Sequence, residues 1–446
     1  MRSRHLLLSP LAAVTSLAAA LGLPACVGAD DAGDASADPT ARRAPGHGGH
    51  GDHGDHGDHP MRNPSGSSSS VSSAGRVALE GGFFTDYGTN GRTCVTCHDP
   101  GEGWGIAVRT LAERFDDSDG LDPLFRPVDG ASSPLADVST VAARRAAYAM
   151  LLHRGTIRVG IGMPAGAEFE LVAVDDPYGF AGAGELSLFR RPLPSTNLGF
   201  IPAVMWDGRV AGATVEAALL AQSNGATLGH AEADQPLTDA ERAEIVAFES
   251  SLTTAQLISN VAGRLDKRGA QGGATALATQ PRVAGRMTLF DGWADLAPTG
   301  NEQRARLAVV RGQALFNDKA SPTGATCRGC HSVANVGTSL NPVFFDVGVS
   351  AGERRTADLP LYTVRNLATG EVRTTTDPGR ALITGLWRDV NRFKAPGLRA
   401  LAARAPYFHN GAAATLRDVV HHYEAALGFS FTPAEESDLV AFLTAL

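Results

Sequence analysis

The sequence predicts a mainly α-helical protein built from two tandem domains of one kind, with a loop-rich insertion in the first domain. The chain carries one five-residue motif twice, Cys94-Val95-Thr96-Cys97-His98 and Cys327-Arg328-Gly329-Cys330-His331. Two segments that follow the first motif recur in the same order after the second. The chain of 446 residues is long enough for two such domains and additional segments.

Each motif has the pattern that attaches a c-type haem. Two thiols spaced by two residues can bond to the vinyl groups of one porphyrin, and the following histidine then binds the iron. A zinc site or a redox dithiol would explain Cys-x-x-Cys alone, but neither explains a histidine after both pairs. We therefore expect two cytochrome-c-like domains with one covalent haem c each. The predicted attachment residues are Cys94, Cys97, Cys327 and Cys330, and the predicted iron ligands are His98 and His331.

The first 75 residues are expected to lie outside these domains. A short basic region and an apolar run from Leu6 to Leu23 predict a lipoprotein-type signal peptide over 1–26, with Cys26 as the lipidated residue. Residues 27–75, rich in His, Gly, Asp and Ser, predict a disordered tether. Its repeat from His47 to His59 is typical of a divalent-metal site or of a solvated spacer. We expect a periplasmic protein that a lipid alone anchors to the membrane.

The remaining chain divides into a first domain over 76–295, with an insertion at about 110–190, and a second domain over 296–446. Leu237–Phe248 and Phe431–Phe442 read as helices that begin with the same Thr-x-x-Glu capping box. Within the insertion, Val141 to His153 predicts a helix, Leu171 to Val174 a short strand, and Asp119 to Phe125 a turn-rich loop. The net charge of −8 and the lack of a basic patch argue against nucleic acid as a partner.

The sequence leaves the sixth iron ligands open. All six methionines lie at or before Met287, so the second haem has no methionine within its own domain. Its candidates are Tyr423, His421, His422, His409 and Tyr407, or no protein ligand. Those of the first haem are His153, Met150, Met163, Met205 and His230. We favour an open iron in the first domain, where Gln222 could donate a hydrogen bond to bound peroxide.

From about residue 76 onward the chain resembles the bacterial dihaem cytochrome c peroxidases and their MauG-type relatives. The segments that carry the resemblance are Met205-Trp-Asp-Gly-Arg209, Arg311-Gly-Gln-Ala-Leu-Phe316, Phe393-Lys-Ala-Pro-Gly-Leu-Arg399 and Ala405-Pro-Tyr-Phe-His-Asn-Gly411. The resemblance implies that the first haem reacts with peroxide, that the second passes it electrons, and that Trp206 relays them. Tyr423 falls where the peroxidases have an axial methionine and the MauG-type proteins a tyrosine.

The chain departs from the family at two places. The family's active-site Gln and Glu correspond to about Ala218 and Thr227, so Gln222 or His230 would have to replace them. The resemblance places a calcium ligand at Arg191, beside carbonyls of Arg404 and Pro406, and an arginine disfavours a cation there. It also allows a homodimer.

These residues predict an oxidoreductase of the cytochrome-c peroxidase kind. It would reduce hydrogen peroxide to water with electrons from a small c-type cytochrome or cupredoxin. Its predicted catalytic residues are Trp206, Gln222 and His230. One alternative is a MauG-like oxidase that uses peroxide to oxidise another substrate, which Tyr423 favours. The other is a dihaem electron carrier without catalysis, which the missing Gln and Glu favour.

Overall fold

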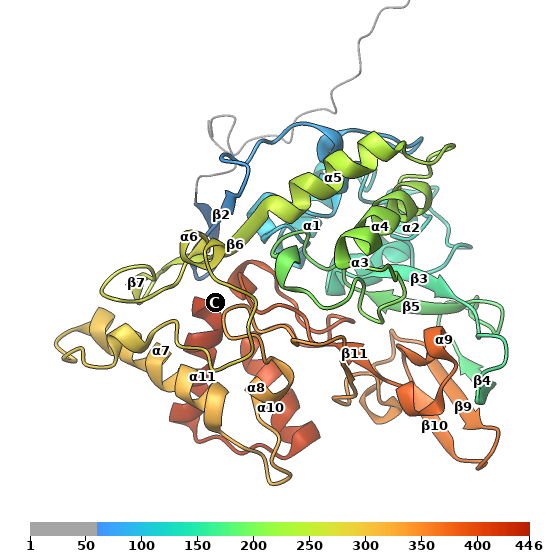
Figure 1. The fold of residues 1–446 in the computed structure, drawn as a ribbon. Helices are drawn as coiled ribbons and strands as arrows, with labels where there is room; N and C mark the ends of the chain where they lie inside the picture. The colour runs from blue at the N-terminus through green and yellow to red at the C-terminus, as the bar shows by residue number, and fades with distance from the viewer. Residues whose placement is uncertain (1–59) are drawn as a thin grey trace, which may run out of the picture. The chain divides into compact units, whose positions relative to one another are not determined.

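The structure is a computed structural model that describes residues 60–446 (Figure 1). The predicted signal peptide, Cys26 and the histidine repeat lie outside these residues. The described helices are α1 (Val108–Ser118), α2 (Val141–Ala147), α3 (Ala149–Arg154), α4 (Val215–His230), α5 (Asp239–Ser251), α6 (Ala274–Ala278), α7 (Asn301–Asp318), α8 (Cys327–Cys330), α9 (Ala381–Thr384), α10 (Leu416–Leu427) and α11 (Pro433–Ala445). None of them is both long and apolar enough to cross a membrane.

Short strands accompany the helices and form four small sheets in the described part of the chain. The strands are β1 (Met61–Asn63), β2 (Gly66–Ser72), β3 (Ile157–Ile161), β4 (Phe169–Asp175), β5 (Leu186–Arg190), β6 (Leu252–Ser259), β7 (Gly263–Arg264), β8 (Phe344–Phe345), β9 (Leu361–Asn366), β10 (Val372–Thr375) and β11 (Phe393–Lys394). The predicted fold class is therefore correct for the helices and incomplete for the sheets.

The two predicted copies end in the same pair of helices. In the first copy α4 and α5 begin at the N-caps Thr214 and Thr238, and in the second α10 and α11 begin at Thr415 and Thr432. Each threonine side chain accepts a hydrogen bond from a first-turn N–H, which no carbonyl of the helix itself can satisfy. The capping boxes predicted for the two final helices are confirmed.

One left-handed residue fixes the chain path ahead of each helix pair. Asn197 has a φ of 59° and its N–H donates to the carbonyl of Leu252 at 3.0 Å. Ala400 has a φ of 57° and its N–H donates to the carbonyl of Leu446 at 2.9 Å. These anchors match Asn197 to Ala400 and Leu252 to Leu446, so residues near them can be compared between the copies.

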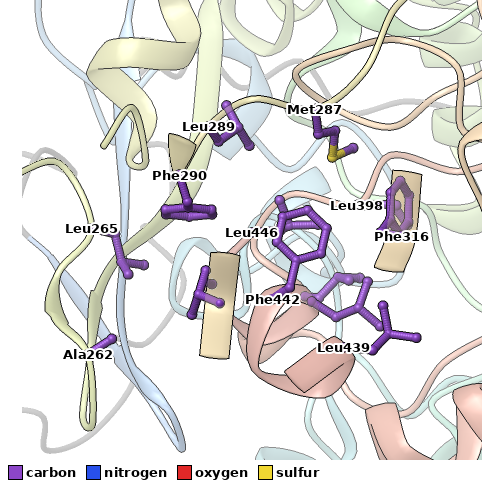
Figure 2. Close-up of a cluster of buried hydrophobic side chains, with 14 of the residues drawn as sticks. Ala262, Leu265, Met287, Leu289, Phe290, Phe316, Leu398, Leu439, Phe442 and Leu446 are labelled. Atoms are coloured by element: carbon purple, nitrogen blue, oxygen red, sulfur yellow. The ribbon is translucent and has the colours of Figure 1, made fainter. Parts of the chain in front are cut away.

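The second copy has its hydrophobic core where α11 packs against α7. Figure 2 shows Phe442 and Leu439 of α11 close to Phe316 of α7 and to Leu398, and Phe442 is completely buried. The two helices approach so closely at Gly312 that a Cβ there would lie 2.0 Å from the carbonyl oxygen of Asp438. A side chain at this position would push α7 and α11 apart.

The predicted end of the tether at residue 75 is wrong. Residues 61–72 form β1 and β2, and β2 pairs antiparallel with β6 from Gly66–Ser259 to Ser72–Leu252. The serines of β2 are held by hydrogen bonds and not by apolar burial, as Ser70 Oγ lies 2.8 Å from Thr254 Oγ1. Low hydrophobicity therefore wrongly predicts disorder for this strand. The ladder with β6 and the pairs of hydroxyl groups satisfy its polar groups.

The insertion is more ordered than predicted, and one of its strands joins the second domain. The strand expected at Leu171 to Val174 is confirmed as β4, which pairs antiparallel with β9. The helix expected over Val141 to His153 is interrupted at Tyr148, which leaves α2 and α3. Tyr362 of β9 donates its hydroxyl proton to the carbonyl of Ser187 on β5 at 2.8 Å. The insertion thus connects the two predicted domains.

Candidate haem sites and the wall between them

The first motif lies at a cavity of about 200 Å³, which we call cavity 1. Cys94–Thr96 form a single 3-10 turn, and a capping box between Thr93 and Thr96 fixes its start. Cys94, Cys97 and His98 line the cavity. The His98 Nδ1 lies 3.1 Å from the carbonyl oxygen of Trp104, which as an acceptor requires the proton on Nδ1. The Nε2 lone pair is then left to bind a metal.

The second motif repeats this arrangement in a cavity of about 190 Å³, which we call cavity 2. Helix α8 begins at the N-cap Thr326, and Cys327, Cys330 and His331 line the cavity. The His331 Nδ1 is hydrogen-bonded to the carbonyl of Gly337, six residues further along, as Trp104 is six residues beyond His98. Both histidines are therefore held in the same tautomer by the same local fold.

The residues of both cavities fit a covalent haem c. The four motif cysteines are free thiols in the described chain, and burial raises the pKa of Cys94 and of Cys327 to about 12. Neutral thiols in separate cavities are a poor zinc site, because zinc needs thiolates around one ion. Burial also lowers the pKa of His98 to about 4, so its imidazole is neutral and can bind iron.

The side chains of α4 line cavity 1 at helical spacing. Leu219, Gln222, Ala226 and His230 lie three or four residues apart and all line the cavity. Two of the three predicted catalytic residues, Gln222 and His230, are thus placed together beside the first motif. The third, Trp206, lines the same cavity from the segment before α4.

His230, whose side chain is 39 % exposed, contacts a buried Arg92–Asp129 ion pair that the sequence did not indicate. The His230 Nδ1 lies 2.5 Å from Asp129 Oδ2, and Arg92 Nη1 donates to Asp129 Oδ1 at 2.6 Å. Burial raises the pKa of Asp129, but bonds from His230 and Arg92 outweigh burial and hold that pKa below its ordinary value. The ionised carboxylate accepts a hydrogen bond from the Nδ1–H of His230. The Nε2 nitrogen is then the one that can interact with a bound ligand.

The insertion supplies Asp129, and a separation of 101 residues from His230 hides this pair in the sequence. The only local signal is the Asp129-Gly130 pair within the insertion that the sequence predicts to be loop-rich. Such turns are common in loops of every kind, so the signal could not have identified a site.

The structure separates the sixth-ligand candidates of the first domain. Met205 and His230 line cavity 1. Met150 instead packs against Phe189 in the core, and Met163 packs beside Phe169. His153 is exposed at the end of α3.

The candidates of the second domain are separated in the same way. Tyr423, Tyr407 and His409 line cavity 2. His421 faces Glu436, with its Nε2 3.1 Å from Oε1. The Nε2 of His422 lies 2.8 Å from the carbonyl oxygen of Val347. Burial raises the pKa of Tyr423 well above its ordinary value.

Trp206 and Lys394 line both cavities and form the wall between them. The indole Nε1 of Trp206 donates to the carbonyl of Arg191 at 2.8 Å, and the Trp206 carbonyl accepts from the Lys394 N–H at 2.9 Å. Trp206 also meets the ring of His409 edge-on, with centroids 6.1 Å apart. Burial lowers the pKa of Lys394 to about 7 although Asp207 acts against burial.

Buried ion pairs fix the wall from the insertion side. Arg190 at the end of β5 donates to Asp377 through Nε at 2.6 Å and to Asp207 through Nη1 at 2.5 Å. Arg190 is 2 % exposed and Asp207 is completely buried. Asp207 directly follows Trp206, so this network sets the position of the indole.

Arg191 occupies the place that the resemblance assigns to a calcium ligand. Its Nη2 donates to the carbonyl of Arg404 at 2.9 Å, and its Nη1 donates to the carbonyl of Arg154 at 3.0 Å. The positively charged guanidinium of Arg191 is thus hydrogen-bonded to the Arg404 carbonyl, which the resemblance assigns to calcium.

The chain is similar in sequence to MauG proteins and to cytochrome-c peroxidases. It is 29 % identical over 287 residues to the methylamine utilization protein MauG of Methylorubrum extorquens, a match that covers 59 % of this chain and 66 % of that protein. It is 29 % identical over 179 residues to the cytochrome-c peroxidase IdrP1 of Pseudomonas sp. strain SCT, over 35 % of this chain and 43 % of that protein. The chain therefore spans less than two thirds of the length of these two relatives.

Among solved structures, the crystal structure of a MauG-like protein associated with microbial copper homeostasis aligns with a TM-score of 0.34 and 18 % identity. That alignment covers 75 % of this chain and 88 % of the other. No family model matches the chain. These sequence relatives support the resemblance of the chain to the superfamily of dihaem cytochrome-c peroxidases and MauG-type proteins, which are peroxidase-like oxidoreductases with haem c.

Proposed function

We propose that the protein is a dihaem c-type cytochrome that reduces hydrogen peroxide to water with electrons from a small c-type cytochrome or cupredoxin. The observation that carries this proposal is the difference between the cavities. Cavity 1 contains the His230–Asp129 pair, whereas cavity 2 is lined largely by apolar and aromatic residues and contains Tyr423. A haem in each cavity would supply an iron that exchanges electrons and, where its sixth site is open, binds peroxide.

Peroxide reduction consumes two electrons and two protons for each molecule and yields two waters. His230 is suited to the proton transfer, because Asp129 holds its Nδ1 and leaves Nε2 to take a proton from one peroxide oxygen and return it to the other. Gln222, about two turns earlier on α4, would donate a hydrogen bond that orients the peroxide. This pair would replace the Gln and Glu of the family.

Trp206 is suited to connect the cavities. It lines both, and its indole is held by a hydrogen bond to Arg191 and by the ion pairs of Asp207. A rigid aromatic side chain shared by the two cavities offers an electron a path with little reorganisation. The Arg190 network would thus be a positioning device for this path.

The test is a steady-state assay of the holo-protein with hydrogen peroxide and a reduced small c-type cytochrome. Rapid oxidation of two donor molecules for each peroxide is expected. If peroxide changes the absorption spectrum of neither haem, the proposal is refuted and the protein is an electron-transfer protein.

A second candidate function is a MauG-like oxidase, which Tyr423 favours because it lies in cavity 2 near the second motif. A phenolate ligand would stabilise high oxidation states of an iron. This candidate predicts a long-lived oxidised spectrum after peroxide and little donor oxidation. Export to the periplasm and lipid anchoring through Cys26 remain proposals from the sequence, and so does a homodimer.

A further inference from the structure

Glu249, near the end of α5, is a buried acid in the wall of cavity 1. It is 4 % exposed, it lines the cavity together with Ser195, and its Oε1 has no hydrogen-bond partner in the described structure. Burial raises the pKa of Glu249 to about 8, although the Ser195 hydroxyl acts in the opposite direction. The side chain is therefore a neutral acid at pH 7 that can still lose its proton.

The second copy has no acid at this place. Counting from the matched anchors, Glu249 lies three residues before Leu252, and Leu443 lies three residues before Leu446. In the same way Ser195 corresponds to Leu398. Leu398 and Leu443 line cavity 2 and belong to the hydrophobic core of the second copy. Leu398 is labelled in Figure 2. One frame thus presents a Ser–Glu pair to cavity 1 and two leucines to cavity 2.

The acid lies on the side of cavity 1 that holds the proximal histidine. The Ser195 N–H donates to the carbonyl of Trp104 at 2.9 Å, and the same carbonyl accepts from His98 Nδ1. A haem bound through His98 would therefore place its iron and its porphyrin close to the acid. The charge of that iron would act on Glu249 across a region with little water, where electrostatic interactions are strong.

Among the described residues, no charged side chain is a cause of the shift in the pKa of Glu249. Helix α4 and the 3-10 turns Gly82–Phe84 and Leu198–Phe200 pack against α5. The two turns carry no charged residue, and the titratable residues of α4 are Glu216 and His230. The causes that shift the pKa of Glu249 are burial and Ser195. The sulfur of Cys94 lies near enough to interact with Glu249. Once it is bonded to a haem as a thioether, this sulfur carries no proton and cannot titrate.

We propose that Glu249 is a redox-linked proton site, which holds a proton while the iron in cavity 1 is reduced and releases it to solvent when that iron loses one electron. One electron leaves to the oxidant or electrode and one proton leaves the carboxyl, so the charge near the iron is conserved. The resulting carboxylate stabilises the oxidised iron. The inference rests on the proposed haem in cavity 1 and not on peroxide turnover.

The test is a spectroelectrochemical titration of the holo-protein between pH 5.5 and 9.5. One of the two midpoint potentials is expected to fall with pH, by at most about 59 mV for each tenfold fall in proton concentration, and the other to stay nearly constant. Glu249→Gln should abolish the dependence. Glu249→Leu, which installs the residue of the second copy, should do the same and keeps the site apolar if glutamine is not tolerated. Glu113→Gln, at an exposed glutamate on α1, is the matched control and should leave the dependence intact.

An infrared difference spectrum gives a readout that does not depend on turnover. Oxidation of the wild-type protein should remove the carbonyl band of a protonated carboxyl, and Glu249→Leu should lack that change. A pH-independent potential in the wild type, or a dependence that survives both substitutions, would overturn the inference. A protein that shows the dependence but does not turn over peroxide would keep the inference and refute the proposed function.

Discussion

Replacement of Asp377 by alanine is expected to destabilise the protein strongly, because it leaves a buried guanidinium half paired. Asp377 accepts two hydrogen bonds from Arg190, from Nε at 2.6 Å and from Nη2 at 2.9 Å. Hydrogen bonds to charged groups contribute about 1.5–3 kcal/mol each. Arg190 would keep its hydrogen bond to Asp207, so its guanidinium would still have one carboxylate partner. We expect the free energy of unfolding to fall by about 3–5 kcal/mol, the usual cost of breaking a buried pair.

The assay is urea unfolding of the holo-protein, followed by far-UV circular dichroism at low and high salt. The loss caused by Asp377→Ala should be similar at both, because buried pairs are screened little. Asp175→Ala is the matched control, since Asp175 also pairs with an arginine, Arg355, but its side chain is 66 % exposed. Exposed pairs contribute about 0–1 kcal/mol, so the control should lose little.

A fall in stability of less than about 1 kcal/mol for Asp377→Ala would refute this reasoning. It would mean that water or a moved side chain replaces the lost carboxylate and that Arg190 is not dependent on the pair. A large loss that disappears at high salt would contradict the burial of the network.

Three further predictions concern the site. His230→Gln should lower peroxide turnover by about 10²-fold or more and change its pH profile, measured by donor oxidation; unchanged turnover would remove His230 from the proton transfer. Dialysis against a calcium chelator should leave turnover and both midpoint potentials unchanged, because Arg191 donates to the Arg404 carbonyl; a loss restored by calcium would contradict this. Asp207 and Glu249 should contribute to the free energy of unfolding with opposite dependence on pH. Burial raises the pKa of Asp207, but Arg190 and Arg209 outweigh burial and hold it below its ordinary value, so the stability from Asp207 is present above pH about 4 and is lost in acid. The pKa of Glu249 is raised from 4.5 to about 8, so its contribution to stability is lost as pH rises between these values. Glu249→Leu should remove this loss.

The helices could be predicted from the sequence because their signals are local. Thr238 and Thr432, each with a glutamate three residues on, determine where α5 and α11 begin, and no distant residue is needed. The strand β2 could not be predicted in this way. Its serines are polar in isolation, and only the distant strand β6 supplies the ladder and the hydroxyl groups that make burial favourable.

The site was predictable to the extent that it follows a helix. Gln222 and His230 are eight residues apart on α4, so helical spacing alone puts them on one face. On α10 the same reasoning could not separate Tyr423 from His421 and His422, because adjacent residues point in different directions and the register is set by packing. Asp129 could not be predicted at all, since the insertion brings it to His230 through tertiary structure alone.

The two copies indicate how one frame can hold two haems of different character. The left-handed residues Asn197 and Ala400 and their bonds to the final helices fix the same backbone path around each cavity. Chemical differences can then arise at wall positions, of which Glu249 and Leu443 are one pair. Substitutions at such positions change the charge beside an iron without moving the histidine that binds it. The division of roles between the two haems can therefore arise from side chains on a common backbone, and exchange of single wall residues is the direct way to measure it.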